Sequence, residues 1–106
     1  MTGDFEVRYT DGARDDLTRL FDFLLERATT AEDFAAAQPA IDNLAAFVEG
    51  HLSRSPFIFR KAGPSPFRRE SIVPFRGAGY VVLYEIEGSA GVNVVAVRHQ
   101  LEDALQ

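Results

Sequence analysis

The chain has 106 residues, of which 46% are hydrophobic and 25% charged, and its net charge is −5. This length suffices for one domain with one modest core, and the composition does not favour intrinsic disorder. The lack of cysteine excludes disulfides and thiolate metal sites, and no apolar run approaches the roughly 20 residues that span a bilayer. We therefore expect one soluble, cytoplasmic domain over residues 1–106, with no membrane association.

Charge is distributed unevenly along the chain. Residues 1–56 hold 11 acids and 5 Lys or Arg, a balance of −6, whereas residues 57–106 hold 5 acids and 6 Lys or Arg, a balance of +1. The cations are densest within residues 57–84, where the chain carries Arg60, Lys61, Arg68, Arg69 and Arg76. Nucleic-acid affinity without sequence preference comes from Lys and Arg that meet phosphates, so the acidic first half argues against a generic polyanion binder.

The first predicted elements are a short strand and a helix. Apolar residues alternate with polar ones from Phe5 to Tyr9, which is typical of a half-exposed strand. Thr10 or Asp11 then supplies a helix cap. The apolar residues that follow recur at three- and four-residue spacing, which predicts a helix over residues 12–28 with one buried face.

A second helix is predicted to start after Thr29 and Thr30, either of which can cap it. Pro39 lies inside this helical pattern. A proline in a helix interior removes one backbone hydrogen bond and clashes with the preceding turn, so we expect a kink at Pro39 or a break into two shorter helices. Residues 50–56 end the helical region.

The second half of the chain predicts four strands, the first of them over residues 57–61. Three more strands lie between residues 67 and 102, separated by turn signals at residues 74–79 and 88–91. Both faces of the strand that starts at Tyr80 are largely apolar. We therefore expect that strand to be central in the sheet and covered on both faces.

In the last strand, regular alternation places Val92, Val94, Ala96 and Arg98 on one face and Asn93, Val95, Val97 and His99 on the other. It puts a fixed cation and a titratable ring on opposite faces where the sheet ends. The order of elements, β-α-α-β-β-β-β, indicates an α+β fold in which an antiparallel helical hairpin packs on one face of a mainly antiparallel sheet. The short tail after residue 100 permits a helix but is too short to hold one alone.

Candidate functional side chains gather on the predicted sheet: Arg68, Arg69, Arg76, Tyr80, Arg98 and His99. Arginines in a sheet concavity can clamp a phosphate, and a histidine or tyrosine beside them can transfer protons during phosphodiester cleavage. The alternative is structural, with the same arginines paired to Glu70, Glu85, Glu102 or Asp103 on neighbouring strands, and residue types alone favour this alternative. His51 and His99 have no partner at metal-ligand spacing and no Gly-rich phosphate loop precedes a helix, so we expect no metal and no cofactor.

Three stretches of the chain resemble toxins of the RelE/ParE superfamily, the toxin half of type II toxin-antitoxin (plasmid stabilization) modules. They are VRYTDGARDDLTRLFDFL from residue 7, RRESIVPFRGAGYVVLYEI from residue 68 and VNVVAVRHQLED from residue 92. The resemblance covers nearly the whole chain and is weakest over residues 28–63. It implies the same β-α-α-β-β-β arrangement and toxicity that leads to growth arrest.

The superfamily divides into two activities. RelE-like members are ribosome-dependent mRNA endonucleases, whereas ParE-like members inhibit DNA gyrase and block replication. The resemblance places Arg68, Arg69 and Arg98 at positions where relatives carry functional cations, with His99 beside the last of them. Lys61 is the one lysine in the chain, and the C-terminal tyrosine that often follows the RHxxED ending is absent. These departures and the negative net charge favour a ParE-like, non-enzymatic gyrase inhibitor over a RelE-like endonuclease or a non-toxic interaction module.

The resemblance also implies a protein partner, a cognate antitoxin that neutralises the toxin within a hetero-oligomer of higher order than 1:1. A sheet with an exposed edge and a basic, apolar concavity suits an extended acidic or amphipathic segment. DNA gyrase is then the expected target and the ribosome the alternative. The residues expected to contact the antitoxin or the target are Arg60, Lys61, Arg68, Arg69, Arg76, Phe57, Phe59, Phe67 and Phe75.

Overall fold

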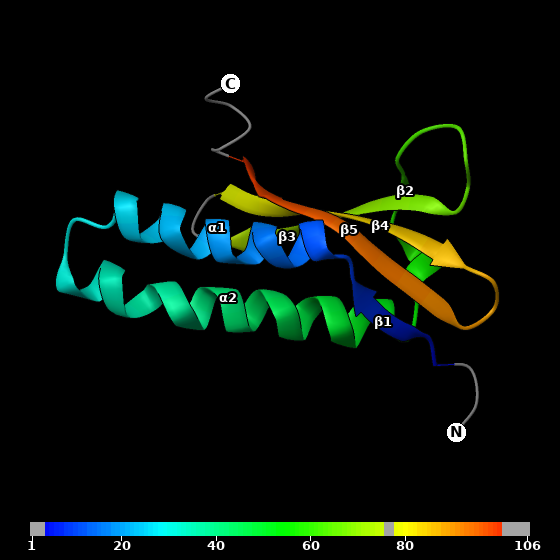
Figure 1. The fold of residues 1–106 in the computed structure, drawn as a ribbon, viewed down its shortest axis with the longest axis horizontal. Helices are drawn as coiled ribbons and strands as arrows, with labels where there is room; N and C mark the ends of the chain where they lie inside the picture. Colours follow the sequence, from blue (N-terminus) through cyan, green and yellow to red (C-terminus); the bar gives the residue numbers. More distant parts are fainter. Residues whose placement is uncertain (1–3, 76–77, 101–106) are drawn as a thin grey trace.

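The computed structural model describes residues 4–75 and 78–100 of the chain. The elements follow in the order β1 (Glu6–Tyr9), α1 (Asp11–Arg27), α2 (Ala31–Leu52), the 3-10 helix η1 (Pro56–Ile58), β2 (Arg60–Lys61), β3 (Arg68–Phe75), β4 (Ala78–Glu87) and β5 (Gly91–His99). Two helices and a sheet form two layers, with the α1–α2 hairpin against one side of the sheet (Figure 1). The α+β prediction is confirmed. The turn residue Arg76 and the tail after residue 100 lie outside the described residues.

The two long helices start where their caps predict. Thr10 accepts a hydrogen bond from the backbone N–H of Ala13 at 3.1 Å, and Thr30 accepts one from the N–H of Asp33 at 3.0 Å. Of the two alternatives predicted at Pro39, a kink or a break, the break is wrong, because α2 is continuous across this residue. Pro39 and Ala35, whose carbonyl loses its intrahelical partner, are both exposed, so water can satisfy that carbonyl.

The sheet has the strand order β1-β5-β4-β3-β2. Strands β2 to β5 form the expected antiparallel meander, and the β4–β5 turn contains Gly88 at φ 60°, a left-handed conformation that suits glycine. β1 pairs in parallel with β5, from Glu6 opposite Gly91 to Tyr9 opposite Val94. The first and last strands of the chain are therefore neighbours, which local sequence patterns do not predict.

The face of the sheet that packs on the helices, here called the covered face, forms the core. Its buried residues are Ser71, Val73, Tyr80, Val82, Tyr84, Ile86, Val92, Val94, Val97 and His99. On the opposite side of β4, Val81 and Leu83 stay partly exposed, and no described element lies over them. The expectation that β4 is covered on both faces is therefore wrong: the strand is central, but the helices cover one face.

A β-bulge interrupts the alternation of β5. Leu83 lies opposite Ala96, whereas its neighbour Tyr84 lies opposite Val94, so Val95 is an extra residue without a counterpart on β4. The alternation predicted for β5 is wrong beyond this point, because the bulge moves every later side chain to the other face. Val97 and His99 consequently join the covered face, and Arg98 points to the opposite side.

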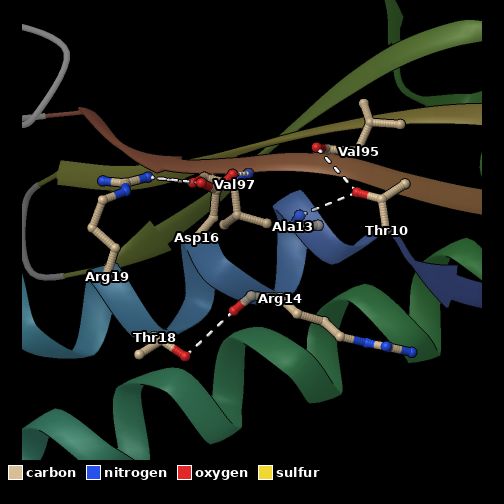
Figure 2. A network of polar contacts seen from close by, with 8 residues as sticks. All are labelled: Thr10, Ala13, Arg14, Asp16, Thr18, Arg19, Val95 and Val97. Atoms are coloured by element: carbon tan, nitrogen blue, oxygen red, sulfur yellow. Dashed lines mark hydrogen bonds and ion pairs between the residues drawn. The ribbon is translucent and has the colours of Figure 1, made fainter.

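Side chains of α1 and of its N-cap residue Thr10 bond the part of β5 that β1 does not reach. Thr10 donates from its hydroxyl to the carbonyl of Val95 at 3.4 Å, and the carboxylate of Asp16 accepts from the N–H of Val97 at 2.8 Å. Arg19 donates to the carbonyl of Val97 at 3.3 Å and pairs with Asp16 at 3.2 Å (Figure 2). The backbone N–H and C=O groups of β5 that lie beyond the end of β1 are thus hydrogen-bonded by the side chains of Thr10, Asp16 and Arg19.

Candidate functional site

The side of the sheet that faces away from the helices, here called the open face, carries several of the predicted site residues. Cross-strand pairs place these residues on it: Arg68, Glu70, Ile72 and Pro74 of β3, Val81, Leu83 and Glu85 of β4, and Ala96 and Arg98 of β5. Its centre is apolar, with Ile72 37% exposed and Val81 and Leu83 partly exposed. Arg68, Glu70 and Glu85 lie toward one end, and Arg98 lies opposite Val81. An open, mixed surface of this kind suits binding of a partner better than it suits catalysis.

Two of the predicted cations on this side of the sheet form ion pairs. Arg68 pairs with Glu85, directly opposite on β4, and Arg60 of β2 pairs with Glu70 of β3. Ion pairs at such partly exposed positions stabilise a fold by about 0–1 kcal/mol. The pairing nevertheless neutralises both guanidinium groups locally, as the structural alternative predicts.

Arg69 has a different role from its neighbour, because alternation places it on the covered side of β3. Its guanidinium donates to the carbonyl oxygens of Pro66, Phe57 and Phe59 at 2.7, 2.9 and 2.8 Å. It also lies over the Phe57 ring, with 5.3 Å between Cζ and the ring centroid. Arg69 therefore holds the segment from η1 to β3 in place and retains its positive charge.

This segment also departs from the predicted strand over residues 57–61. Pro56–Ile58 forms a 3-10 helix instead, and the strand is limited to Arg60–Lys61. Pro56 suits the first helical turn because it has no N–H to donate. The carbonyls of Phe57 and Phe59, which a longer strand would need for its ladder, are bonded to Arg69.

The two candidate proton-transfer groups lie inside the protein. Tyr80 and His99 are 1% and 4% exposed, and their ring centroids are 5.3 Å apart. Phe23 of α1 also packs against His99, with ring centroids 5.3 Å apart. Burial, followed by the nearby charge of Arg27, lowers the pKa of the His99 imidazole. Neither ring is accessible to a phosphate on the surface.

The structure therefore does not bring the predicted cluster together. Arg68 and Arg98 lie on the open face, whereas Arg69, Tyr80 and His99 lie on the covered side. Arg76 is outside the described residues, as is the side chain of Phe75.

Across residues 4–75 and 78–100, no group of three His, Asp or Glu side chains is placed to hold a metal ion. Within the same ranges, no helix is long and apolar enough to cross a membrane.

The predicted aromatic contact residues differ in exposure. Phe59 is half-buried and packs near Phe47, with ring centroids 6.5 Å apart. Phe57 and Phe67 are 46% and 50% exposed. Ile58, which the sequence prediction missed, is 68% exposed, because a 3-10 turn replaces the strand. Phe57, Ile58 and Phe67 together are here called the aromatic end. Pro56 at the first position of a short helix is the sequence signal that could have found Ile58.

Comparison with known families identifies the chain. Residues 7–104 match the family described as "ParE toxin of type II toxin-antitoxin system, parDE". The chain belongs to the ParE toxin family. As a ParE-family chain it is the toxin of a type II toxin-antitoxin system, which confirms the superfamily predicted from the three sequence stretches and selects its ParE branch.

A solved structure supports the fold of this ParE-family chain. It is similar to a chain of the structure titled "Chromosomal ParDE TA system from P. aeruginosa", with a TM-score of 0.68. The match covers 92% of this chain and 98% of that one, at 11% sequence identity. No curated protein sequence matches this chain. At this identity the structural likeness establishes a shared ParE-like fold.

Proposed function

We propose that this ParE-family toxin arrests growth by binding DNA gyrase and blocking replication, without catalysing a reaction of its own. The observation that carries the proposal is the burial of Tyr80 and His99, which removes the two candidate proton-transfer groups from the surface. The ion pairs of Arg60 and Arg68 and the carbonyl bonds of Arg69 support the same reading. Cleavage of RNA needs an acid or base within hydrogen-bond reach of the reacting oxygen.

The proposal includes a cognate antitoxin as the partner that keeps the toxin inactive in a cytoplasmic hetero-oligomer. Family membership supports a toxin-antitoxin pair. The open face supports binding of a second protein, since charged residues border its apolar centre, as protein interfaces commonly have a polar rim.

A gyrase assay tests the proposed target. Purified protein is added to gyrase with relaxed plasmid, and both supercoiling and cleaved DNA are measured on gels. We expect supercoiling to decrease, or cleaved DNA to accumulate, at concentrations that match those reached when induction arrests growth. An unaffected gyrase at those concentrations would remove the target from the proposal.

A ribosome assay tests the alternative activity. Message bound to ribosomes is incubated with the same protein and mapped for new 5′ ends, with Arg68→Ala and Arg98→Ala variants as controls. We expect intact message in all samples. Cleavage by the natural sequence that both variants lose would assign the toxin to the RelE-like activity instead.

A further inference from the structure

We infer that the aromatic end, Phe57, Ile58 and Phe67, is a docking surface for an acidic protein segment that carries an apolar anchor side chain. The inference rests on the proposed function in one respect, because the antitoxin is the partner expected to supply such a segment. The surface itself is defined by contacts, exposure and charge around η1 and the start of β3.

The three residues of the aromatic end are each about half exposed or more. Phe57 contacts Phe67 edge to face at 6.2 Å, and Phe57 also contacts Phe5 at 6.4 Å. Although these rings touch one another, Phe57 and Phe67 remain about half exposed and Ile58 more so. Contiguous exposed apolar side chains with polar surroundings are typical of protein interaction sites.

Charge indicates the chemistry of the partner. Residues 54–69 contain five Lys or Arg and no Asp or Glu, in a chain whose net charge is −5. Glu70 and Glu85 neutralise Arg60 and Arg68, but Arg69 is bonded to carbonyl oxygens and Lys61, directly opposite it on β2, is exposed. The aromatic end is therefore bordered by positive charge on a molecule that is otherwise acidic, which favours an acidic partner.

A hollow beside Phe67 can receive the anchor. It has a volume of about 220 Å³ and is lined by Ser65, Phe67, Arg68, Glu85 and Ile86. Within it, Phe67 and Ile86 can contact an apolar side chain, while Ser65 and the Arg68–Glu85 pair form its polar border. The central contacts of an interface usually come from such anchors in a pocket. The bonds from Arg69 to Phe57 and Phe59 fix the shape of this region before binding, which reduces the entropy cost of docking.

A nucleic acid is the competing occupant, since exposed aromatic rings beside cations can also stack on bases. Two observations favour a protein segment. Ile58, the most exposed residue of the aromatic end, is aliphatic and offers no ring for stacking on bases. Two of the five cations are already paired with carboxylates, which leaves few for a phosphate backbone, whereas a peptide segment also gains affinity from burial of its apolar anchor. The experiment below therefore also measures binding of a nucleic acid, and tighter binding of it would contradict the inference.

Binding of synthetic peptides to the full chain tests the inference by fluorescence anisotropy. One labelled 12-residue peptide alternates Glu with Phe and Leu, a second replaces Glu by Lys, and a third replaces Phe and Leu by Ser. We expect the acidic apolar peptide to bind at least about tenfold more tightly than either control, and its affinity to fall with added salt. Equal binding of the Lys peptide, or tighter binding of single-stranded DNA of similar length, would overturn the inference.

Matched variants locate the site. Phe67→Ser and Ile58→Ser should each weaken the acidic peptide roughly tenfold, and Lys61→Glu roughly threefold. Phe34→Ser is the control, because Phe34 is 53% exposed at the start of α2, at the other end of the molecule (Figure 1). If Phe34→Ser weakened peptide binding as much as Phe67→Ser and Ile58→Ser do, the assignment of the site would be overturned. Growth arrest is measured separately, so a harmless toxin with intact peptide binding would refute the proposed function alone.

Discussion

The two faces of the sheet differ in what their side chains do, although the same strands build both. On the covered face, Val82, Tyr84, Val92 and Val94 are fully buried against the helical hairpin. On the open face, Val81 and Leu83 of β4 remain partly exposed, and Arg68 pairs with Glu85. The contrast indicates that folding stability is concentrated on one side of β4, which leaves the other side free to vary for recognition.

Val82→Ala and Val81→Ala give the largest and most direct test of this contrast, since they remove the same atoms from adjacent residues. We expect Val82→Ala to lower the free energy of unfolding by roughly 2–3 kcal/mol, because it removes buried methyl groups and leaves a cavity. Val81→Ala should lower it by less than about 1 kcal/mol. Urea denaturation measures both, and similar losses would show that the open face is as well packed as the covered one.

Arg69→Ala and Arg68→Ala make a second adjacent pair. Arg69→Ala removes donors from three carbonyl groups, so we expect a loss of about 1–2 kcal/mol and faster amide exchange around η1. Arg68→Ala removes a partly exposed ion pair and should cost less than about 1 kcal/mol. Thermal unfolding with hydrogen exchange distinguishes the two, and a larger loss in Arg68→Ala would contradict the assignment of roles.

Alkaline pH tests two tyrosines that pack in the core, Tyr9 and the fully buried Tyr84. Burial raises the pKa of Tyr9 and Tyr84 from 10 to about 12. Unfolded tyrosines ionise near pH 10 while the folded ones resist, so the free energy of unfolding should fall as the pH rises from about 10 through 12. Tyr9→Phe and Tyr84→Phe should each flatten this fall.

At neutral pH the same two substitutions should differ. Tyr84→Phe loses the 2.6 Å bond from its hydroxyl to the Pro56 carbonyl and should cost about 1 kcal/mol. The buried Tyr9 hydroxyl has no hydrogen-bond partner within the described ranges, so Tyr9→Phe should be neutral or stabilising. A destabilised Tyr9→Phe variant would show that this hydroxyl has a partner in solution.

The smallest effect is expected for His99→Asn, which should change how the free energy of unfolding depends on pH. Its pKa in the folded protein lies below the ordinary 6.5, so the unfolded chain binds a proton more readily. The free energy of unfolding should therefore fall as the pH drops below 6.5, and His99→Asn should reduce that fall. Urea denaturation at pH 7.5 and 5.5 measures it, with the exposed His51→Asn as the matched control. A steeper pH dependence in His99→Asn would be inconsistent with the burial of this ring.

The parts of the fold that local patterns specify could be predicted from the sequence. Helix caps at Thr10 and Thr30 and the three long strands depend on neighbouring residues, and the structure confirms them. The bulge at Val95 depends on pairing with β4 and β1, so simple alternation assigned the wrong face to Ala96 and every later residue of β5. One extra residue thus decides that His99 is buried and Arg98 is exposed.

The candidate site was less predictable for the same reason. The sequence shows where guanidinium groups are, but the atoms that accept their hydrogen bonds come from distant segments. Arg69 and Arg68 are adjacent in sequence, yet one binds backbone carbonyls near η1 and the other a carboxylate on β4. Strand alternation places the two arginines on opposite sides of the sheet, where one meets backbone carbonyl groups and the other meets a carboxylate.

The parallel pairing of β1 with β5 has a consequence for synthesis on the ribosome. Thr10, next to β1, is 85 residues from its bonding partner Val95, so the sheet cannot be completed until nearly the whole chain has been translated. At about 5–20 residues per second, this separation corresponds to a delay of roughly 4–17 s. A nascent toxin therefore keeps an incomplete sheet, with the edge of β5 unpaired by β1 and Thr10, until nearly its whole chain has been made.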